Sequence, residues 1–133
     1  MIFADASALV AIMTGETGAR QLSEALDTDP DRTVSALVVW ESVASLCRSY
    51  GFSVPAARRQ VDGLLDLIGF RLLPIGAMEL ELAIAAYARY GKGRHAAALN
   101  LGDCFAYACA KANDASLLYT GRDFEETDIV SAA

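Results

Sequence analysis

Short apolar segments that alternate with longer helical stretches constrain most strongly what this chain can fold into. Four such segments occur, at residues 2–4, 33–35, 70–75 and 116–119. Apolar runs this short, bounded by turn residues, are typical of buried strands. Strands that are connected through helices run parallel, and helices then cover both faces of the sheet. The pattern therefore predicts an α/β fold with a short parallel sheet.

The stretches between these segments show the three- and four-residue spacing of apolar positions that indicates helices. Glycine and proline mark several helix ends, as at Gly51 and Pro55. Because helix dominates the count, an all-helical bundle is the alternative fold. The 133 residues contain no linker or repeat and are expected to form one domain, 1–133. Helices are expected at about 5–13, 16–26, 37–50, 54–68, 77–90 and 102–113, followed by a last short strand near 129–130.

Composition excludes several classes of protein. Hydrophobic residues make up 54% of the chain and the mean hydropathy is +0.31, which is not typical of disordered proteins. No apolar run approaches the roughly 20 residues of a membrane-spanning helix, and no basic segment precedes the first apolar residues as in a signal peptide. We therefore expect a cytoplasmic protein without a membrane partner. The three cysteines lack metal-ligand spacing and are expected to be small buried hydrophobic residues: Cys47, Cys104 and Cys109.

Four acidic residues stand where strands end, where helices begin, or inside an apolar helix. Asp5 follows the first apolar segment, Asp123 follows the fourth, and Asp103 begins a buried helical stretch. Glu41 interrupts the apolar residues 37–44. Ligands of open α/β sheets bind beyond the carboxyl ends of the strands, so the fold class places the three aspartates near one edge. Our hypothesis is that all four acids surround divalent metal.

Each acid, taken alone, also has a structural explanation. Asp5 and Asp103 are suited to capping helices, because a carboxylate accepts backbone N–H groups and favours a helix N-terminus. Asp123 is suited to stabilising a turn through its own backbone. An unpaired buried carboxylate is very costly, so Glu41 belongs either to a solvated helix face or to a metal pocket. The sequence leaves both explanations open.

Polar neighbours of the acids extend the same alternatives. Ser45 and Arg48 lie four and seven residues after Glu41, on one helix face that is either solvated or lines the pocket. Ser7 and Thr120 lie close to two of the acids in the sequence, and either orient them or serve only a cap and a turn.

Carboxylates without accompanying histidines or cysteines favour hard cations, Mg²⁺ or Mn²⁺, over zinc. Such ions can activate water and polarise a phosphodiester, so no side-chain nucleophile is required. The net charge of −6 argues against broad binding to nucleic acid through phosphate contacts. Bound cations reverse the local sign, however, so a nuclease is not excluded. His95, the only histidine, is expected to face RNA or solvent rather than a metal.

Four segments, in this order, form a pattern that is far more specific than a lone Asp-Ala-Ser. They are Phe3-Ala4-Asp5-Ala6-Ser7-Ala8-Leu9, then Trp40-Glu41-Ser42, then Gly93-Arg94-His95 with residues 99–108, and finally residues 118–124 with Thr127-Asp128. Together they resemble the PIN-domain ribonucleases, and in particular the VapC toxins of type II toxin–antitoxin pairs. The resemblance spans the whole chain.

This resemblance implies a three-layer α/β/α domain with a short central parallel sheet. It also implies a metal-dependent endoribonuclease toxin, with Mg²⁺ or Mn²⁺ as cofactor and RNA as substrate. Asp5, Glu41, Asp103 and Asp123 match the acids that bind metal and carry catalysis in the family. Asp128 matches a further acid, an outer contributor to the site.

Two positions depart from the family pattern. Ala96 follows His95 where relatives often have proline, which loosens that loop. Arg122 stands where relatives often carry Asp or Asn, and its charge either weakens metal binding or adds a phosphate contact. Lys92 and Arg94 are further candidates for phosphate contacts, with surface solvation as the alternative.

The resemblance further implies a homodimer and a cognate VapB-like antitoxin, assembled as a heterotetramer or a larger complex. Such an antitoxin lays a helix into an apolar groove and blocks the site. The helices within residues 37–68 are the candidates for that groove, unless Trp40, Leu64 and Leu67 are simply core. Two other functions remain as alternatives: a DNA-directed PIN-type nuclease, and a non-catalytic PIN-fold binding module that lacks an acid or divalent-metal binding.

Overall fold

A computed structural model describes all residues 1–133, and its centre is a four-stranded parallel sheet. The strands follow the order β3-β2-β1-β4, so β1 lies between β2 and β4. The strands are β1 (Ile2–Ala4), β2 (Arg32–Ser35), β3 (Arg71–Leu73) and β4 (Ser116–Leu118). The helices are α1 (Ala6–Thr14), α2 (Ala19–Leu26), α3 (Ala36–Tyr50), α4 (Val54–Ile68), α5 (Ala77–Tyr90) and α6 (Leu101–Ala112).

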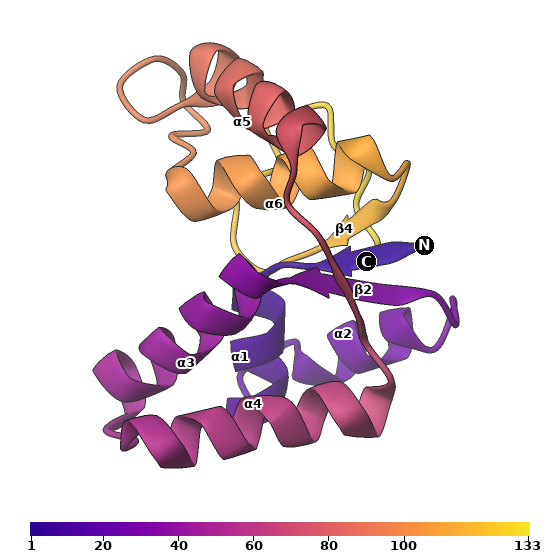
Figure 1. Ribbon diagram of the computed structural model, residues 1–133, viewed down its shortest axis with the longest axis vertical. Helices are drawn as coiled ribbons and strands as arrows, with labels where there is room; N and C mark the ends of the chain where they lie inside the picture. Colours follow the sequence, from indigo (N-terminus) through magenta and orange to yellow (C-terminus); the bar gives the residue numbers. More distant parts are fainter.

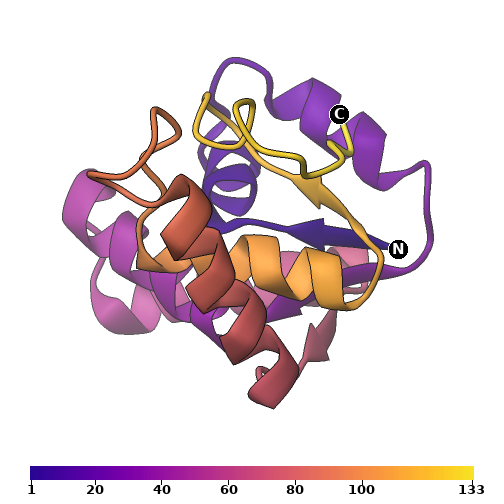
Figure 2. The ribbon, with the colours of Figure 1, turned by 90° about the horizontal axis from the view of Figure 1, so that it is seen from above.

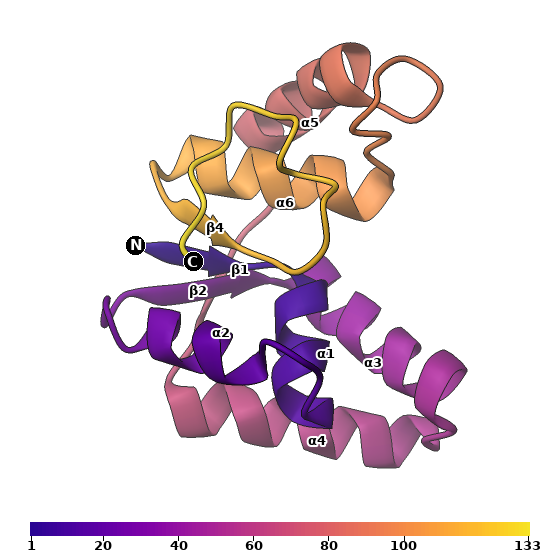
Figure 3. The ribbon, with the colours of Figure 1, turned by 180° about the vertical axis from the view of Figure 1, so that it is seen from behind.

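Helices cover both faces of this sheet and make three layers (Figure 1). One outer layer contains α5 and α6, and Figure 2 shows α5 crossing over α6. The other contains α1 to α4, as the opposite view in Figure 3 also shows. None of the helices combines the length and apolar character needed to span a bilayer. The predicted α/β fold is confirmed, and the all-helical alternative is wrong.

The two largest differences between the predicted and the observed elements both lie near turns. The second helix begins at Ala19 rather than at residue 16, because Gly15 and Gly18 adopt positive φ values of 67° and 93° between the two helices. Residues 129–130 form no strand, although the Leu117 N–H donates to the Val130 carbonyl at 2.8 Å. This C-terminal segment makes only an isolated bridge to β4, through Ser131, and does not extend the sheet.

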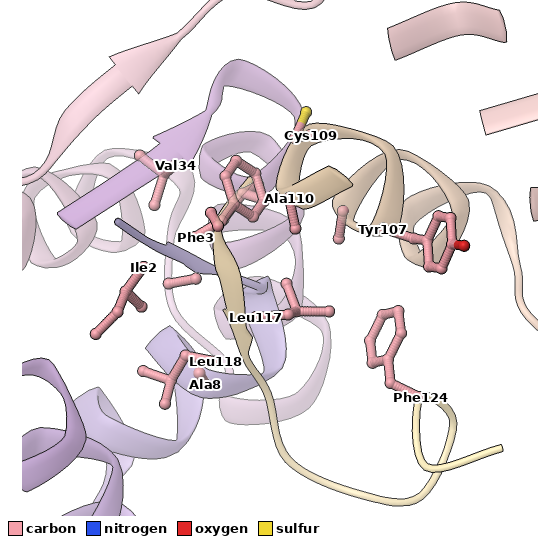
Figure 4. Packing of buried hydrophobic residues seen from close by; sticks show 14 of the residues in the cluster. Ile2, Phe3, Ala8, Val34, Tyr107, Cys109, Ala110, Leu117, Leu118 and Phe124 are labelled. Carbon is pink, nitrogen blue, oxygen red and sulfur yellow. The ribbon is translucent and has the colours of Figure 1, made fainter. Parts of the chain in front are cut away.

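The core lies on both faces of the sheet. Phe3 is fully buried beside Ala110 of α6, whereas its neighbour Ile2 points to the opposite face of the sheet (Figure 4). Leu117 and Leu118 alternate in the same way on β4 (Figure 4). Of the cysteines, Cys104 and Cys109 are buried as predicted, while Cys47 is only partly buried.

Parallel pairing brings the ends of distant segments to one edge of the sheet. Ala4 at the end of β1 pairs with Leu118 at the end of β4, and the next N–H, that of Asp5, donates to the Leu118 carbonyl at 2.9 Å. The helix α6 leads directly into the start of β4, so its own N-terminus, at Leu101, lies toward the same edge. Residues near 5, 103 and 120 therefore meet there.

Candidate active site

A pocket of about 290 Å³ opens at this carboxyl edge of the sheet. Three of the four predicted acids line it, from three different elements: Asp5 after β1, Glu41 of α3 and Asp103 of α6. The helix face of Glu41 that the sequence left undecided also lines the pocket, through Ser45 and Arg48. The other lining residues are Ala6, Ser7, Val10, Glu16 and Thr120.

Asp5 is both a helix cap and a pocket residue, so the two explanations of this acid hold together. Its Oδ2 accepts hydrogen bonds from the Ser7 backbone N–H at 3.1 Å and from the Ser7 hydroxyl at 2.6 Å. The Ser7 hydroxyl in turn accepts the backbone N–H of Thr120 at 3.1 Å. Ser7 therefore joins the ends of β1 and β4 and holds one oxygen of Asp5, which leaves Oδ1 for another ligand.

Asp103 is held in a reciprocal capping box at the N-terminus of α6. Its backbone N–H donates to Asn100 Oδ1 at 2.9 Å, and the Asn100 N–H donates to Asp103 Oδ2 at 3.1 Å. The carboxylate is buried, with 9% of the residue exposed. As at Asp5, one oxygen serves the helix cap and the other is left for the pocket.

Glu41 is the acid whose environment fits a cation best. Its Oε1 is buried and has no hydrogen-bond partner. A buried carboxylate oxygen without a partner is strongly destabilising, because the group loses its hydration and gains nothing in return. A divalent cation bound in the pocket would supply the missing partner. The residues present therefore fit a hard metal ion.

Mutual repulsion and burial act on all three pocket acids. Burial, together with the charges of Asp5 and Asp103, raises the pKa of Glu41 to about 7. Burial also raises the pKa of Asp103 to about 6, and the charges of Asp5 and Asp123 add to this effect. The pKa of Asp5 is raised, mainly by burial, against the opposing hydrogen bonds from Ser7. A bound cation would relieve this repulsion.

The number of acids that can ligate one ion is small. No three His, Cys, Asp or Glu side chains converge closely enough to hold an ion on their own. Mg²⁺ commonly uses only one or two carboxylates and completes its coordination with water and substrate phosphate. The pocket, with its carboxylates of three elements, is suited to that mode.

We expect the stability of the metal-free protein to fall as the pH rises from about 4 to about 7. The folded-state pKa values of Glu41 and Asp103 lie above the ordinary carboxyl value of about 4, so their contribution is complete below that value. The contribution is lost as the pH rises through about 6 and 7, where the folded protein must ionise both groups. Urea unfolding in EDTA across this range measures the effect, and Glu41→Gln should flatten its upper part. An equally steep pH dependence in Glu41→Gln would contradict the assignment.

Asp123 and Asp128 lie outside the pocket. Asp123 is exposed in the segment after β4, close enough for its charge to raise the pKa of both Asp5 and Asp103, but it does not line the cavity. Asp128 accepts hydrogen bonds from the hydroxyls of Tyr107 and Tyr90, and also pairs with Lys111 at 3.2 Å. It anchors the C-terminal segment to the layer of α5 and α6.

The basic loop before α6 does not reach the pocket either. Arg94 stacks over the Tyr87 ring at 5.1 Å, and His95 meets the Tyr90 ring edge-on. The His95 Nδ1 accepts the backbone N–H of Ala97 at 3.0 Å, so the loop folds on itself. Arg122 is exposed and does not line the pocket.

Glu16 is a pocket residue that sequence reasoning missed. It lies in the turn between α1 and α2 and accepts a hydrogen bond from the Tyr50 hydroxyl at 2.7 Å. Nothing in Thr14-Gly15-Glu16 distinguishes it from an ordinary turn acid. The contact to Tyr50, 34 residues away, is a consequence of how α1 packs on α3.

Known proteins resemble this chain over nearly its full length. A PIN domain family model matches residues 2–130. Ribonuclease VapC of Mycolicibacterium smegmatis is 40% identical over 127 residues, which cover 96% of both chains. Ribonuclease VapC42 of Mycobacterium tuberculosis is 42% identical over 126 residues, which cover 94% of both chains.

Solved structures share the fold at lower sequence identity. VapC20 of Mycobacterium tuberculosis, described as a sarcin-ricin loop cleaving toxin, superposes with a TM-score of 0.76 at 20% identity and covers 98% of this chain and 97% of its own. A toxin–antitoxin complex from Klebsiella pneumoniae gives a TM-score of 0.72 at 19% identity, covering 100% of this chain and 98% of its own. The match over almost the whole sequence and the three-layer fold with acids at its carboxyl edge lead to one conclusion: this chain belongs to the PIN-domain family, among the VapC ribonucleases.

Proposed function

We propose that this protein is an endoribonuclease toxin of a type II toxin–antitoxin pair and depends on Mg²⁺ or Mn²⁺. The observation that carries the proposal is that three carboxylates line one pocket, Asp5 and Asp103 buried and Glu41 partly buried, with Glu41 Oε1 lacking any partner. In a chain related to VapC ribonucleases, such a pocket is suited to phosphodiester hydrolysis.

The side chains of this pocket have separable roles in the proposed reaction. Asp5, Glu41 and Asp103 would surround the ion, one or two of them as direct ligands and the rest through water, with Asp123 adding negative charge from outside. When bound, a divalent ion activates water and polarises the scissile phosphodiester. Ser7 and Asn100 hold one oxygen each of Asp5 and Asp103, so these carboxylates are oriented before substrate arrives. Glu41, with a pKa near 7, can retain a proton until a cation replaces it.

Cleavage of a labelled total-RNA pool, with Mg²⁺, Mn²⁺ or EDTA, tests the proposal directly. We expect discrete cuts with either ion and none with EDTA. Single-stranded and duplex DNA, run in parallel, test the alternative nuclease. Cleavage of DNA alone would contradict the proposed substrate, and EDTA-resistant RNA cleavage would contradict the metal.

Arg48 is the one cationic residue that lines the pocket, and we propose that it contacts a phosphate of the RNA backbone. It is exposed on α3 and forms no ion pair, so its guanidinium is available to a ligand. A charge-assisted hydrogen bond of this kind is worth about 1.5–3 kcal/mol, so Arg48→Gln should raise KM about 10-fold or more. The cleavage rate at saturating RNA should change much less.

Arg59→Gln is the matched control, because Arg59 is also exposed and unpaired but lies on α4. Both variants lose one positive charge, so only a local contact separates them. Loss of a phosphate contact should also weaken the dependence of RNA binding on salt. Equal KM values for the two variants would show that Arg48 acts only through net charge.

A second, apolar groove of about 610 Å³ lies between α3 and α4, and we propose that an antitoxin helix occupies it. Trp40 and Leu72 line it with 68% and 58% of their surface exposed. The alternative that Trp40, Leu64 and Leu67 are core residues is wrong for Trp40 and for Leu67, because both side chains are largely exposed. Leu64 is partly buried. An amphipathic helix is the partner that such a groove fits.

Trp40 is the only tryptophan, so its fluorescence reports on this groove without labelling. Binding of the cognate antitoxin should shift its emission to shorter wavelength, because the exposed indole becomes buried. Trp40→Ala should weaken the complex, as loss of a central aromatic anchor commonly costs about 2 kcal/mol or more. An unchanged emission spectrum in a stable complex would place the antitoxin elsewhere.

We also propose the homodimer, through the outer face of α5. Met78, Ile84 and Tyr87 are about half-exposed or more there, and a groove of about 510 Å³ is lined by residues of α5, of α6 and of the loop between them. Exposed apolar patches of this kind commonly mark protein interfaces. Light scattering measures the mass of the protein alone and of its complex with the antitoxin. A monomeric mass for the protein alone at micromolar concentration would contradict the proposal.

A further inference from the structure

Gly102 is the second residue of α6, between the capping residue Asn100 and the pocket acid Asp103. A Cβ atom built on Gly102 would lie 2.6 Å from Glu41 Cδ and 2.8 Å from Glu41 Oε1, and closer still to Oε2. Real Cβ atoms essentially never approach another heavy atom within 3.0 Å. The carboxylate of Glu41 thus occupies the space where any other residue would begin its side chain.

The backbone does not require glycine at this position. Gly102 is not among the glycines with positive φ, and it lies in the first turn of a helix, where alanine is generally favoured over glycine. Gly63 of α4 is a helical glycine with open space around it, where nothing lies within 4 Å of a built Cβ. Space for Glu41 is therefore the specific reason for glycine at 102.

The added atom would displace Glu41 rather than the helices. The capping box fixes Asp103, the residue after Gly102, and with it the start of α6. The backbone of α3 is a regular helix of 15 residues, so it does not yield either. The end of the Glu41 side chain is free to rotate away, because Oε1 has no hydrogen bond to keep it there. A methyl group at 102 would therefore move this carboxylate away from Asp103 and leave the fold intact.

We propose that Gly102 is a positioning residue, whose missing side chain lets the Glu41 carboxylate lie against the N-terminus of α6 beside Asp103. The inference deepens the proposed function and rests on it for its catalytic consequence. The structural part stands by itself, because it concerns two side chains of the metal-free protein. The two parts therefore need separate readouts.

The structural test is a double-mutant cycle on the thermal unfolding of the metal-free protein, at one pH. In the Glu41→Ala background, Gly102→Ala should raise Tm by roughly 3 °C, the gain typical of replacing a helical glycine. In the wild-type background the gain should be absent or reversed, because the methyl group meets Glu41. Gly63→Ala, the matched control, should raise Tm equally in both backgrounds. The same Tm change for Gly102→Ala in both backgrounds would overturn the proposal.

The functional test compares Mn²⁺ affinity, by calorimetry with the metal alone, and RNA cleavage. Gly102→Ala should weaken Mn²⁺ binding and reduce cleavage about 100-fold, as expected when a reacting group moves by about 1 Å. Gly63→Ala should change neither. Glu41→Asp, which withdraws the carboxylate by one methylene group, should restore part of the Mn²⁺ affinity of Gly102→Ala.

The two readouts separate the possible failures. Absence of Mn²⁺ binding and cleavage in the wild type, with the Tm coupling present, would overturn the proposed function and leave the steric role of Gly102 standing. Wild-type Mn²⁺ affinity in a folded Gly102→Ala variant would overturn the positioning role itself. The positioning role would also be overturned if Gly102→Ala lowered Mn²⁺ affinity as much in the Glu41→Ala background as in the wild type.

Discussion

Replacing Asp103 by asparagine is expected to reduce RNA cleavage by more than about 100-fold while the protein stays folded. Residues that only orient a metal ligand commonly account for about 10–100-fold in affinity or activity, and Asp103 itself lines the pocket. Asparagine keeps an oxygen that can accept the Asn100 N–H, so the capping box survives. The change also removes a buried charge that burial and the charges of Asp5 and Asp123 disfavour, so the metal-free Tm should not fall at pH 7.

Asp114→Asn is the matched control for this experiment. Asp114 is exposed just beyond the other end of α6, so the variant loses the same charge far from the pocket. Its positive φ of 52° is a conformation that asparagine also adopts. The comparison is made with single-turnover cleavage of one RNA substrate, and Asp5→Asn should behave as Asp103→Asn does. Retained activity in a folded Asp103→Asn variant would refute the shared acidic site.

Truncation of Phe3 to alanine is expected to lower the free energy of unfolding by about 3–5 kcal/mol. Phe3 is fully buried on the central strand β1, with neighbours in β2 and β4 and Ala110 of α6 against its ring (Figure 4). Removing the ring leaves a cavity that the close-packed sheet and helix cannot fill. Domains of this size have a total stability of about 5–15 kcal/mol, so the variant should be near its threshold.

Urea unfolding in EDTA measures this loss without any contribution from metal. Leu67→Ala is the control, because Leu67 is 85% exposed and its truncation should change stability by less than about 0.5 kcal/mol. The loss of unfolding free energy for Phe3→Leu should lie between the losses for Phe3→Ala and Leu67→Ala. A loss below about 1 kcal/mol for Phe3→Ala would show that the sheet repacks around this position.

Local features of the sequence were sufficient to predict most of the elements. Gly51 ends α3 at φ 70°, Ser53 caps α4 and Pro55 lies in its first turn, all within a few residues of the boundaries that they set. The strand predicted at 129–130, which is absent, depends on a more distant contact. Residues 129–130 are apolar enough for a strand, but only their contact with β4 decides how far the sheet extends.

Site residues could be predicted from the sequence where the strand and helix order determines their place. They could not be predicted where the packing of distant segments determines it. Asp5 and Asp103 follow from the strand and helix ends on which they lie. Asp123 follows a strand in the same way, yet it is exposed and lies outside the pocket. Glu16 enters the pocket through a turn that has no distinguishing pattern.

By itself, the sequence determined the order of the elements, their parallel arrangement and the edge of the sheet at which the acids gather. Those properties arise from hydrophobic periodicity, helix caps and strand connections, which act over a few residues or over one chain crossing. Only the tertiary structure decided which acids share a pocket and that Glu41 requires Gly102 beside it. Glu41 and Gly102 are 61 positions apart, and van der Waals exclusion between such residues exists only once α3 and α6 have packed together.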